Sequence, residues 1–199
     1  MIERYQVRST RLTTHYGEFE FHCFSWGPHE EDNILCLVKH PITGQPLVRV
    51  QSACYTAEIF RSLDCDCHEQ LEESLARIRS EGGIFIYVVC DGRGAGLLKK
   101  TEGLELGRTN GLDTSEAYRQ LGLEQDPREY RRVVEILRHF NIGSVRLLTN
   151  NPRKLDGLSK GGIVTHREPL EIPATVHSKS YLKTKAIKMG HLLSEFREF

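Results

Sequence analysis

The sequence predicts an α+β fold, a mixed α/β domain in which N-terminal antiparallel strands join a mixed β-sheet core that is flanked by helices. Three observations predict it. The chain has 199 residues, which suits a single domain spanning residues 1–199. Residues 1–60 have mainly the patterns of strands. From residue 67 onward, helical and strand-like segments alternate, as in domains whose helices cover a sheet.

The N-terminal segments have strand patterns that are separated by turn residues. Tyr16–Trp26 alternates loosely between polar and apolar side chains, and Asn33–Lys39 contains the apolar run Ile-Leu-Cys-Leu-Val. Pro46–Val50 is a third such segment, and the turn-forming sequence Pro-Ile-Thr-Gly precedes it. We expect these strands to pair antiparallel.

Helices and buried strands follow in alternation. A first helix is expected over Cys67–Ile78, because apolar residues recur there on one helical face, and two glycines at 82–83 end it. Gly83–Cys90 is then a near-continuous apolar run, typical of a strand that is buried on both faces. The other expected segments are helices at Glu116–Leu121 and Asp126–Phe140, a strand at Ser144–Thr149, a helix beginning at Pro152, and a C-terminal helix beginning near Tyr181.

The charge composition speaks against proteins that coat nucleic acids or anionic membranes. The chain has 27 basic and 27 acidic side chains, so its formal net charge is zero, whereas proteins that coat polyanions carry a basic excess. No segment reaches the roughly 18 consecutive apolar residues of a transmembrane helix. The N-terminal residues carry charges where a signal peptide has an apolar segment. We therefore expect a cytoplasmic protein without nucleic-acid or membrane partners.

The sharpest chemical feature is the group Cys54, Cys65 and Cys67, spaced C-x10-C-x-C. Two thiolates in a turn before a helix, and a third after an earlier strand, can occupy three corners of a tetrahedral zinc site. A fourth corner left to water would make the zinc catalytic, because zinc lowers the pKa of a bound water molecule. Two alternatives stay open: His68 or Cys90 could complete a structural zinc site, or the thiols could bind no metal.

A glycine-rich turn, Asp91–Gly96, follows the long apolar strand. Its three glycines would let a ligand approach the backbone closely, and Arg93 adds a cation for a phosphate or a base edge. A tight turn with a solvent-facing arginine explains the same residues equally well.

A second possible anion site lies at Thr149–Lys154, between a strand and a helix. Pro152 suits the first helical position. Free N–H groups at that helix start, with Arg153 and Lys154 beside them, can bind an anion. The alternative is an asparagine cap followed by two solvated bases.

Asp126 has two interpretations. As an N-cap, with Pro127 and Glu129 in the first helical turn, it completes a capping box without any catalysis. A carboxylate fixed at the start of a helix is also compatible with proton transfer. The identity of the residue does not separate the two roles.

Taken together and in order, these segments resemble GTP cyclohydrolase II, over roughly residues 5–194. The segments that carry the resemblance are Arg49–Cys54, Ser62–Cys67, Asp113–Ala117, Arg146–Pro152 and Tyr181–His191.

The resemblance implies a zinc hydrolase that opens the imidazole ring of GTP at C8. Such enzymes release formate and pyrophosphate, leave a diaminopyrimidinone ribosyl phosphate, and begin riboflavin biosynthesis. The family is dimeric, which implies a homodimer, and it uses Mg²⁺ with the triphosphate.

The resemblance also implies roles for individual residues. Cys54, Cys65 and Cys67 would hold one zinc ion. Asp126 would be the proton acceptor, and Arg128 the group that attacks the α-phosphate. The residues implied to contact the nucleotide are Arg49, Gln70, Asp91, Arg93, Thr114, Thr149 and Lys154.

Several positions depart from the family's pattern. Asp91 replaces a glutamate, Ala53 replaces the glutamate before the first cysteine, and Cys90 replaces a glutamine. Leu104 stands near the position of a tyrosine to which the family's formate release is attributed. A one-residue insertion near Gly107–Asn110 shifts the local loop.

Two alternative functions stay open. The missing tyrosine and the missing glutamate at position 53 would suit a divergent enzyme that stops at the formamidopyrimidine nucleotide, or that acts on another purine nucleotide in a specialised pathway. A non-catalytic nucleotide-binding protein with a structural zinc is an alternative of a different class.

Overall fold

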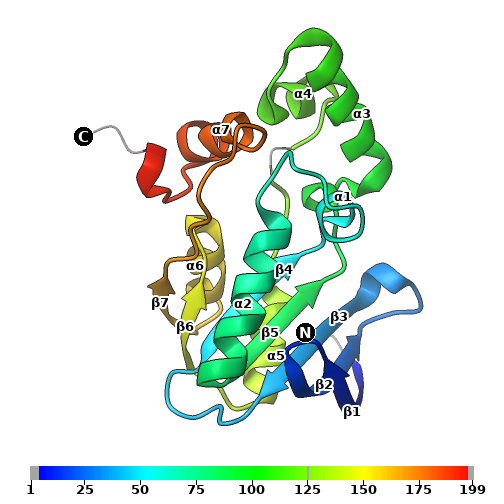
Figure 1. The fold of residues 1–199 in the computed structure, drawn as a ribbon. Helices are drawn as coiled ribbons and strands as arrows, with labels where there is room; N and C mark the ends of the chain where they lie inside the picture. Colours follow the sequence, from blue (N-terminus) through cyan, green and yellow to red (C-terminus); the bar gives the residue numbers. More distant parts are fainter. Residues whose placement is uncertain (1–4, 125, 197–199) are drawn as a thin grey trace.

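A mixed sheet of seven strands, in the order β1-β2-β3-β5-β4-β6-β7, organises residues 5–124 and 126–196, which are the residues that the computed structural model describes (Figure 1). The strands are β1 Gln6–Thr14, β2 Gly17–Ser25, β3 Asn33–Lys39, β4 Leu47–Ser52, β5 Gly83–Val88, β6 Ser144–Leu148 and β7 Val164–Glu168. The α-helices are α1 Tyr55–Glu58, α2 Cys67–Glu81, α3 Gly96–Asn110, α4 Thr114–Gln120, α5 Arg131–His139, α6 Pro152–Lys160 and α7 Lys179–Met189. Short 3-10 helices occupy Glu30–Asp32, Gly92–Gly94 and Ser194–Phe196.

The sheet has an antiparallel half and a parallel half. Strands β1, β2, β3 and β5 pair antiparallel, whereas β4 pairs parallel with both β5 and β6, and β6 pairs parallel with β7. The predicted fold class is therefore confirmed, with antiparallel strands at the N-terminus and a mixed sheet. The expected antiparallel pairing of Pro46–Val50 was wrong, because the strand that contains it, β4, lies between β5 and β6 and pairs parallel with both.

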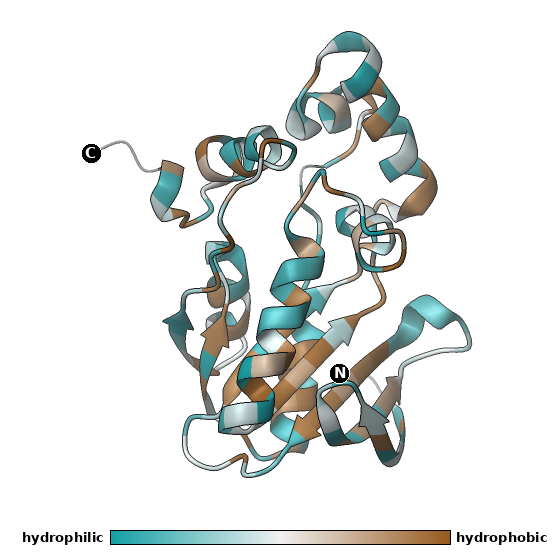
Figure 2. Cartoon of the chain, viewed as in Figure 1, coloured by the Kyte–Doolittle hydropathy of each residue, from teal (hydrophilic) through white to brown (hydrophobic). Residues whose placement is uncertain are grey.

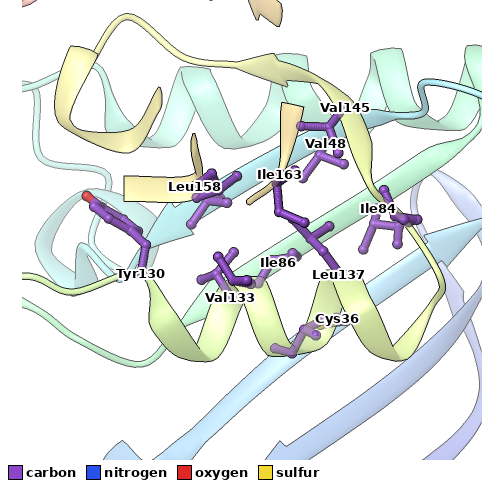
Figure 3. Packing of buried hydrophobic residues seen from close by; sticks show 14 of the residues in the cluster. Cys36, Val48, Ile84, Ile86, Tyr130, Val133, Leu137, Val145, Leu158 and Ile163 are labelled. Atoms are coloured by element: carbon purple, nitrogen blue, oxygen red, sulfur yellow. The ribbon is translucent and has the colours of Figure 1, made fainter. Parts of the chain in front are cut away.

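Helices cover both faces of the sheet, and each face has its own apolar core. Helix α5 packs Val133 and Leu137 against Ile84 and Ile86 of β5 on one face (Figure 3). Helix α2 packs Leu75 and Ile78 on the opposite face, against residues that include Leu47 and Phe85. Figure 2 shows hydrophobic residues concentrated on the central strands, with helices of mixed character around them. Burial on both faces explains why β4 and β5 are near-continuous apolar runs.

The parallel half of the sheet positions the functional residues. Because β4, β5 and β6 run parallel, their carboxyl ends meet at one edge of the sheet. Helices α3, α4 and α7 lie beyond that edge (Figure 1). Within the described part of the chain, no helix combines the length and apolar character needed to cross a membrane.

The predicted start of the long helix was wrong. Helix α5 begins at Arg131 with Tyr130 as its N-cap, so Asp126 is not a cap and no capping box forms there. Both oxygens of the Asp126 carboxylate accept hydrogen bonds from the Arg128 guanidinium instead. A charge-assisted bidentate pair outweighs the hydrogen bond that a cap would make to one backbone N–H.

Four of these helices and strands had no counterpart among the predicted segments: β1, the short helix α1, α3 and β7. Helix α3 has Gly103 as its only buried residue, so it lacks the apolar stripe that identifies a helix from sequence. Strand β1 is almost entirely exposed, and β7 has no fully buried residue. Edge strands without a buried face lose the alternation by which strands are found.

Candidate active site

One cavity at the carboxyl edge of β4, β5 and β6 gathers nearly all the predicted site residues. They come from the end of each strand, from the first turn of α2 and α4, and from the segment before α5. The predicted residues that line the cavity are Arg49, Cys54, Cys65, Cys67, Gln70, Asp91, Arg93, Thr114, Arg128, Thr149 and Lys154. Asp126 is the exception: it lies behind Arg128 and is only 5% exposed.

The three cysteines meet at one end of this cavity. Cys54 follows β4 and caps α1, while Cys65 and Cys67 stand at the start of α2. Their sulfur atoms all lie within 4.8 Å of one another, and the Sγ atoms of Cys54 and Cys65 are 3.9 Å apart. Thiolates on a tetrahedral zinc ion, with Zn–S bonds of about 2.3 Å, are about 3.8 Å apart. The spacing and the donor set therefore fit zinc.

Neither residue considered as a fourth protein ligand joins this group. The His68 ring instead contacts the Arg61 guanidinium and lies 3.7 Å from Glu72. Among the residues that the structure describes, the only group of three or more potential metal ligands is the three cysteines. The arrangement leaves room for a non-protein fourth ligand, as in catalytic rather than structural zinc sites.

The three cysteine thiols differ in pKa, and Cys54 has the lowest. Hydrogen bonds from Cys65 and Cys67 hold the pKa of the Cys54 thiol well below its ordinary value, and the charge of Lys100 lowers it further. Lys100 Nζ lies 3.3 Å from Cys54 Sγ and 2.8 Å from Asp91 Oδ1. A thiolate is the form that binds metals, so this end of the cavity is prepared for a cation.

Buried cations also line this cavity, and the part around Arg49 and Lys154 is called its cation end below. Arg49 is 5% exposed, and its guanidinium donates to the side-chain oxygens of Gln51 and Gln70 and to the Leu148 carbonyl. These partners are neutral, and burial lowers the pKa of Arg49 to about 10. The Gln70 side chain therefore meets Arg49 at the cavity wall.

Lys154, in the first turn of α6, is buried in the same way. Its Nζ donates to the Val50 carbonyl at 2.6 Å, and the side chain sits at 6% exposure. Burial holds the pKa of Lys154 well below its ordinary value, and the positive charges of Arg49 and Arg128 add to this effect. An anionic ligand would relieve the repulsion between these cations.

Asp126 and Arg128 form a bidentate pair. Arg128 Nε and Nη2 donate to the two carboxylate oxygens at 2.6 and 2.7 Å, and Nη1 donates to the Ser52 hydroxyl at 3.0 Å. Burial raises the pKa of Asp126, but the hydrogen bonds and charge of Arg128 together bring it below its ordinary value. The carboxylate is thus ionised and directly joined to Arg128.

The two predicted anion loops keep their positions at the strand ends. Arg93 has left-handed backbone angles, and its guanidinium lies 4.8 Å from the centre of the Tyr118 ring. Asn151 caps α6 and Pro152 begins it, as the sequence predicts. Thr149 is 1% exposed, and its hydroxyl accepts a hydrogen bond from the Asn151 N–H.

Helix α7 supplies a wall that the sequence analysis assigned no role. Tyr181, Lys185 and His191 line the cavity. Lys185 Nζ lies 3.1 Å from Asp66 Oδ1 and 4.4 Å from the Tyr181 ring centre. Burial lowers the pKa of His191 to about 3, with a further contribution from Lys185 and Lys154. Matching residues in the C-terminal segment carried part of the resemblance, but only the fold brings them to the cavity.

Two of the departures from the family's pattern also lie at the cavity. Leu104, on α3, and Ala53, between β4 and Cys54, both line it. The Tyr118 hydroxyl, from the neighbouring α4, donates to the Gly92 carbonyl at 3.1 Å. The position of Leu104 therefore presents an apolar side chain to the cavity.

Comparisons with known proteins match this chain to one family. The family model described as GTP cyclohydrolase II matches residues 4–169. The riboflavin biosynthesis protein RibBA of Staphylococcus aureus (strain COL) is 41% identical over 184 residues, and that of Staphylococcus epidermidis is 40% identical over the same length. Each match covers 92% of this chain but 46% of the relative, so the chain spans about half the length of these relatives.

A solved structure also matches. It is RibBX of A. baumannii, a two-domain 3,4-dihydroxy-2-butanone 4-phosphate synthase, with 20% identity and a TM-score of 0.46. The match covers 83% of this chain and 40% of that one. The family model spans most of the chain, including the cysteines, the strand-end loops and Lys154. The chain therefore belongs to the GTP cyclohydrolase II family.

Proposed function

We propose that this chain opens the imidazole ring of GTP at C8 and releases formate and pyrophosphate, to give 2,5-diamino-6-ribosylamino-4(3H)-pyrimidinone 5′-phosphate for riboflavin biosynthesis. The observation that carries the proposal is a single cavity that is lined both by a cluster of three thiols, here called its thiol end, and by buried cations. GTP has a group that suits each of them. Its base carries the carbon to be hydrolysed, which suits the thiol cluster, and its triphosphate carries the negative charge, which suits the cations.

The thiol end would receive the base. Cys54, Cys65 and Cys67 would hold one zinc ion, which when bound supplies Lewis acidity and activates water at neutral pH. Arg93, stacked near Tyr118, would stand beside the base or the ribose. The reacting carbon would then lie near the end of β4, since Cys54 stands two residues after that strand.

The cation end would receive the triphosphate, together with Mg²⁺. Arg49 and Lys154 are held by neutral partners, so their charge is available to an anion. Removing these cations from water is costly, and a phosphate group would offset that cost through charge-assisted hydrogen bonds. Thr149 and the start of α6 would add neutral donors.

Asp126 and Arg128 would act at the α-phosphate. A nucleophile with a base at hydrogen-bond distance is the general arrangement of nucleophilic catalysis. Asp126 lies within 2.7 Å of two guanidinium nitrogens and is ionised, so it can accept a proton from Arg128 as Arg128 attacks phosphorus. Transfer of the nucleotidyl group to Arg128 would form a phosphorus–nitrogen bond and expel pyrophosphate. Water would then cleave that bond, which would release the 5′-phosphate and return the proton from Asp126 to Arg128.

The test is an assay of the purified protein with zinc, Mg²⁺ and GTP. Formate, pyrophosphate and the absorbance of the diaminopyrimidine are followed together, and the proposal requires that all three appear. Nucleotide binding without turnover, across GTP and other purine nucleotides, would instead indicate a non-catalytic nucleotide-binding protein with a structural zinc.

Leu104 favours a second candidate, in which the enzyme stops at the formamidopyrimidine nucleotide. Its apolar side chain lines the cavity where a tyrosine would offer a hydroxyl. In that case the wild type accumulates a formylated pyrimidine without free formate, and Leu104→Tyr gains formate release. Equal formate release by the wild type and by Leu104→Tyr would reject this candidate.

A further inference from the structure

Lys100 has no role among those predicted from the sequence, yet its ammonium group contacts the cysteine cluster. It stands on α3, and its side chain is 13% exposed. Its ammonium group donates to Cys54 Sγ at 3.3 Å and to Asp91 Oδ1 at 2.8 Å. Lys100 therefore joins a helix beyond the sheet to one sulfur of the cysteine cluster.

Asp91 fixes the ammonium group and the Cys54 backbone together. Its Oδ1 accepts from Lys100 and from the Gly92 N–H, and its Oδ2 accepts from the Tyr55 N–H at 3.0 Å. Tyr55 directly follows Cys54. One carboxylate thus holds the residue after the first cysteine and the cation that contacts its sulfur. Asp91, which is one methylene shorter than the glutamate of the family, reaches all three of these donors.

The charge of Lys100 addresses a difficulty of a three-thiolate site. Three thiolates carry one negative charge more than a divalent metal neutralises, and they donate more charge to it than histidines do. A metal held by them is a weaker Lewis acid. A hydrogen bond from an ammonium group withdraws charge from the sulfur that accepts it, and such contacts to metal ligands tune both orientation and reactivity.

We propose that Asp91 and Lys100 are positioning residues for Cys54: Asp91 holds the Lys100 ammonium against the Cys54 sulfur, which restores the Lewis acidity of a metal bound by the three cysteines. The inference rests on the metal site of the proposed function. It assigns Asp91 a role through Lys100 and Cys54, distinct from the nucleotide contact that the family resemblance implies.

Cobalt(II) provides a test that does not depend on turnover. Purified apoprotein is loaded with Co²⁺, and the thiolate-to-cobalt charge-transfer band is recorded without GTP. In Lys100→Met the Cys54 sulfur loses its donor and becomes easier to oxidise, so the band moves to longer wavelength. In Lys100→Arg a cationic donor remains, and the band stays closer to its wild-type position. In Asp91→Asn the ammonium is held less firmly, and the band moves part of the way.

Metal binding gives a second readout. Competition with a chelator should show about 10–100-fold weaker cobalt binding in Lys100→Met, the usual effect of losing a partner of a metal ligand. The matched control is Lys99→Met, on the same helix, where Lys99 pairs with Glu102 at 2.7 Å and is 44% exposed. This control should have the wild-type band and affinity. If Lys100→Met does not load cobalt, the Asp91→Asn band decides.

Two results would overturn the inference. One is a wild-type band position in cobalt-loaded Lys100→Met or, where that variant does not load, in Asp91→Asn. The other is an unchanged band with weaker GTP binding in Lys100→Met, which would make Lys100 a substrate contact. Because the spectrum is recorded without substrate, a wild type that fails to open GTP would refute the proposed function and leave this test intact.

Discussion

Lys100 and Lys154 are two lysines that line one cavity, and their partners differ. Lys100 contacts a carboxylate and a thiol, both of which can carry negative charge. Lys154 donates to the backbone carbonyl of Val50, and its charged neighbours include Arg49 and Arg128. Accordingly, the pKa of Lys100 is raised by Asp91 and Cys54 in spite of burial, whereas burial lowers that of Lys154.

Lys100 therefore has anionic partners for its charge, whereas the hydrogen-bond partner of Lys154 is neutral. A buried cation with an anionic partner keeps its charge in the free protein, and it can act on that partner. A buried cation with neutral partners destabilises the free protein, and an anionic ligand offsets this cost only when it binds. The thiol end is thus organised before ligands arrive, whereas the cation end is completed by its ligand.

The largest effect is expected from removing a thiol. Cys65→Ala leaves two sulfur ligands where at least three are needed, so the protein should lose zinc and all ring opening. Elemental analysis of the purified variant and a formate assay measure the two losses. Cys23→Ala is the matched control, because Cys23 lies on β2, outside the cavity lining, and it should keep both properties. Turnover by metal-free Cys65→Ala would contradict a zinc mechanism.

A large loss of GTP binding with a gain in stability is expected from Lys154→Met. Losing one partner of a buried charge interaction costs about 2–5 kcal/mol of binding, so kcat/KM for GTP should fall about 30-fold or more. The free protein should become more resistant to urea, because methionine replaces a buried amino group whose charge is disfavoured by burial and whose hydrogen bond goes to the Val50 carbonyl. Steady-state kinetics and urea unfolding of the apoprotein measure both effects.

Lys160→Met is the control for that variant, since Lys160 is on the same helix, pairs with Asp156 and is 76% exposed. It should change neither GTP turnover nor stability appreciably. If Lys154→Met binds GTP as well as the wild type does, the cation end does not bind the triphosphate.

The two ends also differ in how far the sequence predicted them. The structure brings the three predicted cysteines together and begins α6 at the predicted residue, because turn and cap patterns are local in sequence. Asp126 matched a capping pattern, but Arg128, two residues away, competes for the same oxygens. Local pattern alone does not decide between a backbone N–H and a guanidinium.

Lys100 shows what sequence patterns miss. Helix α3 carries no apolar stripe, so neither the helix nor the direction of its side chains was predicted. The contact of Lys100 with Cys54 joins residues 46 positions apart, and it depends on how α3 packs beyond the sheet. The same holds for Lys185 and His191, which reach the cavity only because α7 returns to it.

A pH effect of moderate size is expected at the cation end. Burial lowers the folded-state pKa of His191 to about 3, from an ordinary value near 6.5. Between these values the unfolded chain binds a proton that the folded protein does not, so stability is lost as the pH falls. By pH 5 this amounts to about 2 kcal/mol. Urea unfolding of the apoprotein at pH 8 and pH 5 should show this loss in the wild type, and a smaller loss in His191→Gln. The exposed His177, changed to Gln, is the control, and equal losses in all three proteins would contradict the assignment.

The smallest effect is expected from the ion pairs that join the two walls beyond the sheet. Lys188 on α7 donates to Asp113 and to Glu116, at the start of α4. Exposed ion pairs contribute little and are screened by salt, so Lys188→Met should raise KM for GTP only a few-fold, and only at low ionic strength. Steady-state kinetics at low and high salt measure this. If Lys188→Met lowers kcat/KM for GTP as much as Lys154→Met does, and does so at high salt too, then GTP binding at the cation end depends on the position of α7 rather than on buried charge.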